Sequence, residues 1–265
     1  MKSNIPRKII LVTGSNKGIG YSIIEELLKQ NTEMNIILSS RNQKLGETAV
    51  QKLLQKFPKF QPQLFYHQLD ITNKDSIISI ANWIKEKFGK INILFNNAGI
   101  YNLPKKDVIT TNVFGTINIT EHFLKNDLIS ENGKIINVGS QLGSYSSAGK
   151  YKNDFKSAKS VEDLLKLSNQ YLSENWSSSP YSISKLVIHI FSRILGQDKK
   201  IIQKNIGVFS MHPGWCRTDM GGSGAPLPVE HGAEIGIFII NLPDGINPKL
   251  QGKYFDEASE KVIEY

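Results

Sequence analysis

The sequence predicts an α/β protein built on a doubly wound parallel sheet of about seven strands with helices on both faces. Two observations predict it. Short, β-branched apolar runs alternate along the chain with longer stretches of helical spacing. The length of 265 residues and a hydrophobic fraction of 40% suit one large core. We therefore expect a single domain over residues 1–265.

The first apolar run leads straight into a glycine-rich turn. Residues 9–12 read as a buried parallel strand, and residues 21–30 show helical spacing. Between them the glycines follow the spacing Gly14-x3-Gly18-x-Gly20, which differs from the common Gly-x-Gly-x-x-Gly pattern. A purely structural turn is the alternative, but the flanking strand and helix favour a pyrophosphate site at the helix N-terminus. The prediction is a Rossmann fold that binds a dinucleotide.

The remaining elements follow from the same patterns. Further strands are predicted at 35–39, 64–69, 91–95, 134–138, 206–211 and around 252–255. Helices are predicted at 43–57, 75–88, 181–195 and 229–242, with a long one carrying Asn112 and a shorter one capped by Ser160 inside a polar insert at 141–179. The glycine- and proline-rich segment at about 217–230 is expected to be a lid over a bound ligand.

Arg41 indicates which dinucleotide is bound. It follows the second strand together with Ser40, where nucleotide-binding folds usually place an acid for the ribose 2′-hydroxyl, about twenty residues past the glycines. An arginine there would pair with a 2′-phosphate instead, and Lys17 on the glycine turn would reach the same group. The prediction is NADP(H) over NAD(H).

Tyr181 and Lys185 are the candidate catalytic pair. They are four residues apart on a predicted helix and so share one face. The neighbouring ammonium is expected to lower the phenol pKa from about 10. Taken alone, the pair also fits a tyrosine packed over a solvated lysine. Ser140 and Asn97 follow two parallel strands and are therefore expected at the same sheet edge as the glycine turn.

Composition argues against several other classes of protein. The net charge is +8, but acidic residues are interleaved with the lysines and no basic cluster carries aromatic residues, so we expect no nucleic-acid partner. The single cysteine, Cys216, allows no intrachain disulfide, and the histidines lack ligand spacing, so no metal is expected. The longest apolar run, residues 235–240, is too short to span a membrane. Residues 1–7 lack a signal-peptide core, so the expected location is the cytoplasm.

Four motifs occur in one order along the chain: Thr13-Gly14-x-x-x-Gly18-Ile19-Gly20, Asn96-Asn97-Ala98-Gly99, Ser140 with Tyr181-x-x-x-Lys185, and Pro213-Gly214-x-x-x-Thr218. Together they resemble the short-chain dehydrogenase/reductase family over nearly the whole chain. Within that family the sequence is most similar to the monomeric NADPH-dependent carbonyl reductases, and also to the sniffer and C-factor branch.

The resemblance implies a role for each matching residue. Tyr181 would donate a proton to the carbonyl oxygen, and Lys185 would bind the nicotinamide ribose and depress the tyrosine pKa. Ser140 would hydrogen-bond the substrate oxygen, and Asn112 would anchor a water that links Lys185 to solvent. The NADP(H) site would comprise Gly14, Ser15, Asn16, Lys17, Gly18, Ile19, Gly20, Arg41, Asp70, Ile71, Asn97, Ala98, Gly99, Tyr181, Lys185, Pro213, Gly214, Trp215 and Thr218.

The activity implied is NADPH-dependent reduction of aldehydes, ketones or quinones to alcohols. A dedicated hydroxysteroid or oxoacyl reductase is one alternative, and a dinucleotide-binding signalling protein with incidental turnover is another. The long insert at 141–179 is typical of the monomeric reductases, in which it covers a dimer-forming helix, so a monomer is expected. The segment between Gly99 and Asn112 is shorter than in those reductases, and it lines the substrate entrance. Cys216 lies near the nicotinamide end, where a packing role is expected rather than a reactive thiol.

Overall fold

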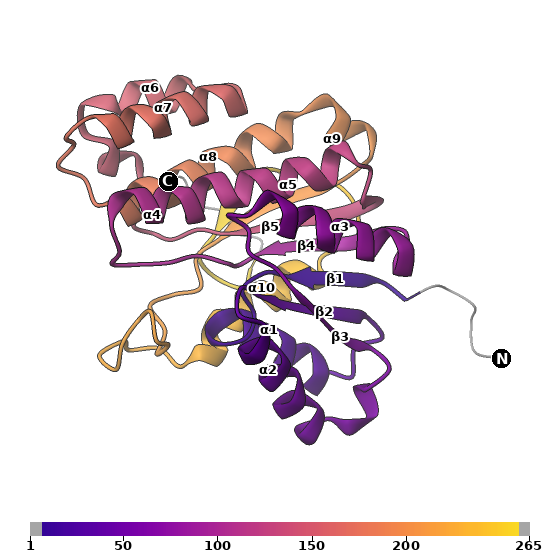
Figure 1. Cartoon of the computed structure of the whole chain (residues 1–265). Helices are drawn as coiled ribbons and strands as arrows, with labels where there is room; N and C mark the ends of the chain where they lie inside the picture. The colour runs from indigo at the N-terminus through magenta and orange to yellow at the C-terminus, as the bar shows by residue number, and fades with distance from the viewer. Residues whose placement is uncertain (1–6, 260–265) are drawn as a thin grey trace.

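The computed structural model describes residues 7–259. Residues 1–6, which belong to the segment predicted to lack a signal peptide, lie outside this range. Within that range a seven-stranded sheet has the order β3-β2-β1-β4-β5-β6-β7, and every neighbouring pair is parallel (Figure 1). The strands are β1 (Ile9–Val12), β2 (Asn35–Ser40), β3 (Leu64–Gln68), β4 (Ile91–Asn96), β5 (Ile129–Val138), β6 (Gly207–Met211) and β7 (Lys253–Phe255). The predicted doubly wound fold is confirmed.

Helices cover both faces of the sheet. One face carries α1 (Gly18–Lys29), α2 (Gln43–Lys56) and α10 (Val229–Asn241). The other carries α3 (Lys74–Phe88), α4 (Lys105–Ile109), α5 (Thr116–Lys125), α8 (Pro180–Gln197) and the short α9 (Lys199–Gln203). Successive residues of β1 face opposite cores: Leu11 packs with α3, α5 and α8, and Ile10 with α1 and α10. Burial on both faces explains why the strands read as unbroken apolar runs.

The fifth strand is longer than predicted. It begins at Ile129, which pairs with Ile91, and the register shifts before Lys134 pairs with Ile93. Residues 130–132 between them are partly or fully exposed. The sequence therefore lacks an apolar run there, and the prediction of a strand starting at 134 missed its first half.

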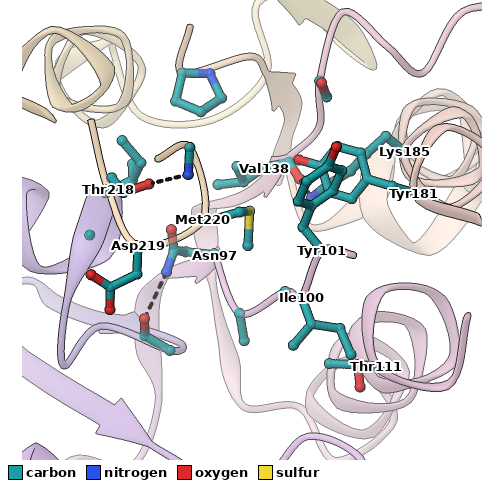
Figure 2. A pocket seen from close by; sticks show the side chains of 18 of the residues that line it. Asn97, Ile100, Tyr101, Thr111, Val138, Tyr181, Lys185, Thr218, Asp219 and Met220 are labelled. Atoms are coloured by element: carbon teal, nitrogen blue, oxygen red, sulfur yellow. Dashed lines mark hydrogen bonds between the residues drawn. The ribbon is translucent and has the colours of Figure 1, made fainter. Parts of the chain in front are cut away.

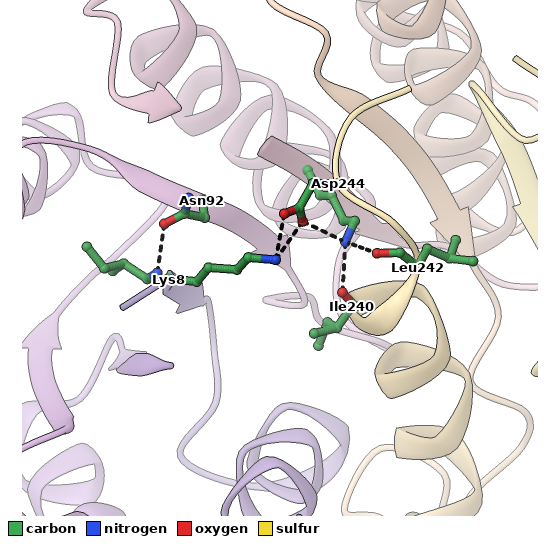
Figure 3. Close-up of polar contacts among 7 residues, drawn as sticks. Lys8, Asn92, Ile240, Leu242 and Asp244 are labelled. Carbon is green, nitrogen blue, oxygen red and sulfur yellow. Dashed lines mark hydrogen bonds and ion pairs between the residues drawn. The ribbon is translucent and has the colours of Figure 1, made fainter. Parts of the chain in front are cut away.

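Lys134 is buried on β5 and connects the sheet to the end of α10. Its Nζ donates to the carbonyl oxygens of Ile240 at 2.8 Å and Leu242 at 2.6 Å. Asp244 lies 3.6 Å from the same nitrogen and 2.6 Å from Nζ of Lys8 (Figure 3). A cation at a helix C-terminus is favourable, so this contact anchors α10 at the sheet edge opposite the strand carboxyl ends.

The predicted long helix around Asn112 is interrupted. The structure has α4, then a π-helical turn η2 (Thr110–Gly115), then α5. A Cβ added at Gly115 would lie 2.9 Å from Cγ1 of Ile71. The wider turn therefore occurs where the helix passes close to Ile71 in the loop after β3, and it contains Asn112.

The insert at 141–179 folds over the outer side of α8. It contains η3 (Tyr145–Tyr151), α6 (Lys152–Ser157) and α7 (Val161–Ser173). The capped helix predicted from Ser160 is confirmed, because Ser160 Oγ accepts from the Asp163 amide at 3.1 Å and Asp163 returns the bond. The first two helices were not predicted, since their serine- and lysine-rich sequence has little apolar periodicity. Among residues 7–259 no helix is long and apolar enough to cross a membrane.

Candidate active site

A cavity of about 630 Å³ opens at the carboxyl edge of the sheet. It is bordered by the glycine turn after β1, the loops after β2 to β6 and the first turns of α8 (Figure 2). Most of the residues predicted for the dinucleotide site line it: Gly14, Asn16, Lys17, Gly18, Ile19, Arg41, Asp70, Ile71, Asn97, Ala98, Gly99, Tyr181, Lys185, Pro213, Gly214, Trp215 and Thr218. Chain segments far apart in sequence therefore meet at one site, as expected for parallel strands.

The glycine turn packs against the loop after β4. Gly14 has φ +61°, and a Cβ there would lie 2.8 Å from Cα of Ala98. Asn97 fixes this contact, because its Nδ2 donates to the carbonyl oxygens of Thr13 at 2.9 Å and Gly14 at 3.0 Å. At Gly14 the main chain of the turn therefore lies directly against the loop after β4, with no room for a side chain between them.

Two residues predicted to hold the dinucleotide lie behind this wall instead. Ser15 is buried and its Oγ donates to the carbonyl oxygen of Val12 at 2.7 Å. Gly20 is also buried, and a Cβ there would lie 2.5 Å from Nδ2 of Asn97. Both support the shape of the turn, so the spacing of the glycines marks packing as well as ligand approach.

A dinucleotide fits these residues. Gly18, with φ +60°, begins α1 and faces the cavity, so the amide groups of the helix N-terminus are open to an anion. The exposed Lys17 and Arg41 supply positive charge at the same end. Lys17 Nζ lies 2.7 Å from Oδ2 of Asp219, which joins the glycine turn to the loop after β6.

Tyr181 and Lys185 lie together at the opposite end of the cavity from Thr218 and Asp219 (Figure 2). Ser140 also lines the cavity. Lys185 Nζ lies 5.4 Å from the centre of the Tyr181 ring and donates to the carbonyl oxygen of Val138 at 2.7 Å. The Ser140 side chain lies near enough to that of Tyr181 to lower the pKa of the phenol in part. The residues that the sequence predicts as hydroxyl, phenol and ammonium partners are thus neighbours.

The predicted direction of the Tyr181 pKa shift is wrong for this structure. Burial raises the pKa of Tyr181 to about 12, and the Ser140 side chain offsets only part of the shift. Burial also lowers the pKa of Lys185 to about 8. Desolvation of both groups outweighs their mutual attraction, because the lysine ammonium is directed to the Val138 carbonyl.

Asn112 lies next to the cavity rather than in its lining. Its Oδ1 accepts from the Ile100 amide at 2.8 Å, and its Nδ2 donates to the Ile100 carbonyl at 2.9 Å and to Ser184 Oγ at 3.1 Å. The amide therefore joins the loop after β4 to α8. The neighbouring Thr111 lines the cavity in its place.

The mouth of the cavity is apolar. Tyr101, Leu142, Trp215 and Met220 line it and are among the most exposed large hydrophobic side chains of the described residues. The Tyr101 ring meets the Tyr181 ring edge-on, with centroids 5.0 Å apart. The sequence analysis covered Tyr101 only as part of the segment between Gly99 and Asn112 that is expected to line the substrate entrance, and it did not identify Leu142. Both residues follow the end of a parallel strand within five residues, and that position was the available signal.

The loop after β6 is braced by its own contacts. Arg217 Nη1 donates to the Pro226 carbonyl at 2.7 Å, and Trp215 Nε1 to the Gly221 carbonyl at 2.9 Å. Cys216 is buried, its Sγ donates to the Pro213 carbonyl at 3.0 Å, and burial raises the pKa of the thiol. These observations agree with the expected packing role of the cysteine.

Fold and site together define a Rossmann-type protein in which a serine, a tyrosine and a lysine flank the dinucleotide cavity. The short chain dehydrogenase family model matches residues 8–153. "Carbonyl reductase [NADPH] 1" of Sus scrofa is 31% identical over 100% of this chain and 96% of its own length, and that of Mus musculus is 30% identical over 97% and 98%. The chain belongs to the short-chain dehydrogenase family.

Solved structures agree at the level of the fold. Salutaridine reductase from Papaver somniferum has a TM-score of 0.81 and 25% identity, covering 94% of this chain and 99% of its own. The NADPH-bound carbonyl reductase from chicken fatty liver has a TM-score of 0.72 and 24% identity, covering 98% and 100%.

Proposed function

We propose that this protein is an NADPH-dependent carbonyl reductase that converts aldehydes, ketones or quinones to alcohols. The observation that carries the proposal is the meeting of Ser140, Tyr181 and Lys185 in a cavity that continues to the glycine turn. The full-length similarity to proteins named carbonyl reductase supports the same activity.

NADPH supplies the hydride when it is bound. Its pyrophosphate would lie against the turn from Gly14 to Gly18, where backbone amides are open to an anion. Arg41 and Lys17 would hold the 2′-phosphate, since both line the cavity and carry exposed positive charge. Asp70 and Ile71 would flank the adenine at the end of β3.

The chain's own groups polarise and protonate the carbonyl. Ser140 and Tyr181 present two hydroxyl groups to one oxygen, and such fixed donors stabilise a developing oxyanion by several kcal/mol. A tyrosine pKa raised to about 12 keeps the phenol protonated at neutral pH, so Tyr181 is ready to act as the acid. The pKa of Lys185, lowered to about 8, lets its ammonium exchange a proton near neutrality.

The test is NADPH oxidation with a panel of quinones, aldehydes and ketones. Tyr181→Phe is expected to lower kcat by about 10²- to 10⁴-fold, because the proton donor is removed, while the Kd for NADPH stays close to that of the wild type. Tyr66→Phe is the matched control, since it also removes one phenol hydroxyl but from β3.

Equal activity of wild type and Tyr181→Phe would refute the role of the tyrosine. A wild type that binds NADPH tightly but turns over none of the panel would favour the alternative of a dinucleotide-binding signalling protein. The proposal also includes the cytoplasmic location predicted from the sequence, which fractionation of cells that express a tagged copy tests.

A further inference from the structure

We propose that His189 is a positioning residue for carbonyl reduction: it holds the main chain of Ser140 so that the serine hydroxyl stays beside Tyr181. The inference rests on the proposed function. His189 is fully buried and does not line the cavity, so it acts through Ser140 and not on the substrate.

His189 continues the face of α8 that carries the catalytic pair. Tyr181, Lys185 and His189 are each four residues apart, one turn of helix. All three contact the end of β5: Tyr181 the Ser140 side chain, Lys185 the Val138 carbonyl at 2.7 Å, and His189 the Ser140 carbonyl at 2.9 Å. The third contact thus fixes the same strand end from one turn further along the helix.

The ring of His189 is held from several sides. Its Nε2 lies 2.9 Å from the carbonyl oxygen of Ser140 and 3.3 Å from the amide nitrogen, and its Nδ1 lies 3.0 Å from Ser210 Oγ on β6. Because the contact of Nε2 with the carbonyl oxygen is the shorter of its two contacts, we assign the ring proton to Nε2. Nδ1 then accepts from Ser210 Oγ. The Tyr254 ring packs against it, with centroids 4.3 Å apart. Either tautomer would connect the ring to both Ser140 and Ser210.

The strand end runs directly over this ring. A Cβ added at Gly139 would lie 2.1 Å from Cε1 of His189, so only glycine permits the approach. The Ser140 carbonyl that His189 contacts also accepts from the Gly143 amide at 2.9 Å, which closes the turn after β5. That turn directs Ser140 Oγ, which accepts from the Leu142 amide at 3.2 Å.

The positioning contact requires a neutral imidazole with one donor and one acceptor. Burial lowers the pKa of His189 to about 4, so the ring is neutral near pH 7. Loss of the ring would release the turn, and an error of about 1 Å in a reacting group can cost about 10²-fold in rate.

The experiment compares two substitutions at this position. His189→Val removes the ring contacts with Ser140 and Ser210 and is expected to lower kcat by about 10- to 100-fold, with KM and the Kd for NADPH little changed. His189→Gln keeps an amide that can donate to the Ser140 carbonyl and is expected to recover most of kcat. The control is Ser192→Ala on the same helix, which removes a buried hydrogen bond from Asn137 of 2.8 Å; it should lower Tm and leave kcat unchanged.

A kcat for His189→Val equal to that of Ser192→Ala would overturn the inference, as would a His189→Gln enzyme no faster than His189→Val. Should His189→Val not fold, Ser210→Ala decides, because it removes only the partner of Nδ1. A several-fold fall in kcat at unchanged KM is then expected, and an unchanged kcat overturns the inference. A wild type without carbonyl reduction would refute the proposed function instead.

Discussion

At the scale of single residues, we expect the choice between NADPH and NADH to depend most directly on Arg41. It follows β2, is exposed, and lines the cavity. Arg41→Asp is expected to lower kcat/KM for NADPH by about 100-fold and to shift preference towards NADH, because a carboxylate repels a 2′-phosphate and accepts from a 2′-hydroxyl. Steady-state kinetics with both cofactors measures the shift, and Lys44→Asp on α2 is the charge-matched control. Equal or better use of NADH by the wild type would contradict the prediction.

His189 and His212 make the stability of the protein sensitive to acid. Burial lowers the pKa of each to about 4, from 6.5. Between pH 6.5 and about 4 the unfolded chain binds more protons than the folded one. The free energy of unfolding therefore has its full value, as far as these groups are concerned, above pH 6.5, and it falls as the pH drops from 6.5 through about 4. For the fully buried His189 the loss is roughly 3 kcal/mol.

Urea unfolding at pH 7, 5.5 and 4.5 checks this prediction. The free energy of unfolding of the wild type should fall over this range, and His189→Gln should fall less. Asp127, whose pKa is lowered from 3.8 to about 2, contributes a loss of stability only below this pH range. Parallel pH dependence in wild type and variant would show that His189 is not the source.

At the scale of elements, α8 is what assembles the candidate site. Its first three turns carry Tyr181, Lys185 and His189, and each contacts the end of β5. The π-helical turn is joined to the same helix, through Asn112 Nδ2 and Ser184 Oγ at 3.1 Å. The geometry of the catalytic groups therefore follows from the register between one helix and one strand.

The start of α1 is expected to tolerate no side chain at Gly20. Gly20→Ala should lower Tm and weaken NADPH binding, since its Cβ would lie 2.5 Å from Nδ2 of Asn97 and 2.9 Å from Cα of Ser15. Displacing Asn97 would open the contact between the glycine turn and the loop after β4. Thermal unfolding and fluorescence titration with NADPH measure the two effects. Gly224→Ala, where an added Cβ meets nothing within 4 Å, is the control and should match the wild type.

At the scale of the whole molecule, the insert at 141–179 decides which face of α8 is open to contact with another chain. Phe155 of α6 and Leu164 of α7 lie in the same hydrophobic core as Val187 and Ile190 of α8. Arg193 Nη2 also donates to the Ala158 carbonyl at 2.8 Å. The outer face of the helix is thus packed inside the chain itself.

A covered α8 predicts a monomer. Light scattering is expected to give a mass near 29.7 kDa that does not change with protein concentration, because association through this helix would require the insert to detach. The same measurement with NADPH bound serves as the control for a cofactor-dependent change. A mass of twice that value would contradict the prediction.

Much of this architecture could be predicted from the chain, because the signals are local. Strands buried on both faces leave apolar runs, a one-turn spacing aligns Tyr181 with Lys185, and parallel strands bring their ends to one edge. The unpredicted parts depend on contacts distant in sequence. They include the first half of β5, the apolar residue Leu142 at the mouth, and the place of Ser15 behind the glycine turn.

The sequence by itself determined the sheet and the edge at which the candidate site lies, since these follow from periodicity and residue type, and its motifs named the candidate reacting groups. Only the tertiary structure decided the protonation behaviour of Tyr181 and Lys185 and the contact between His189 and Ser140. The physical reason is that a pKa depends on how completely a group is removed from water. Burial is set by all the elements that pack around a residue, and no spacing along the chain encodes it.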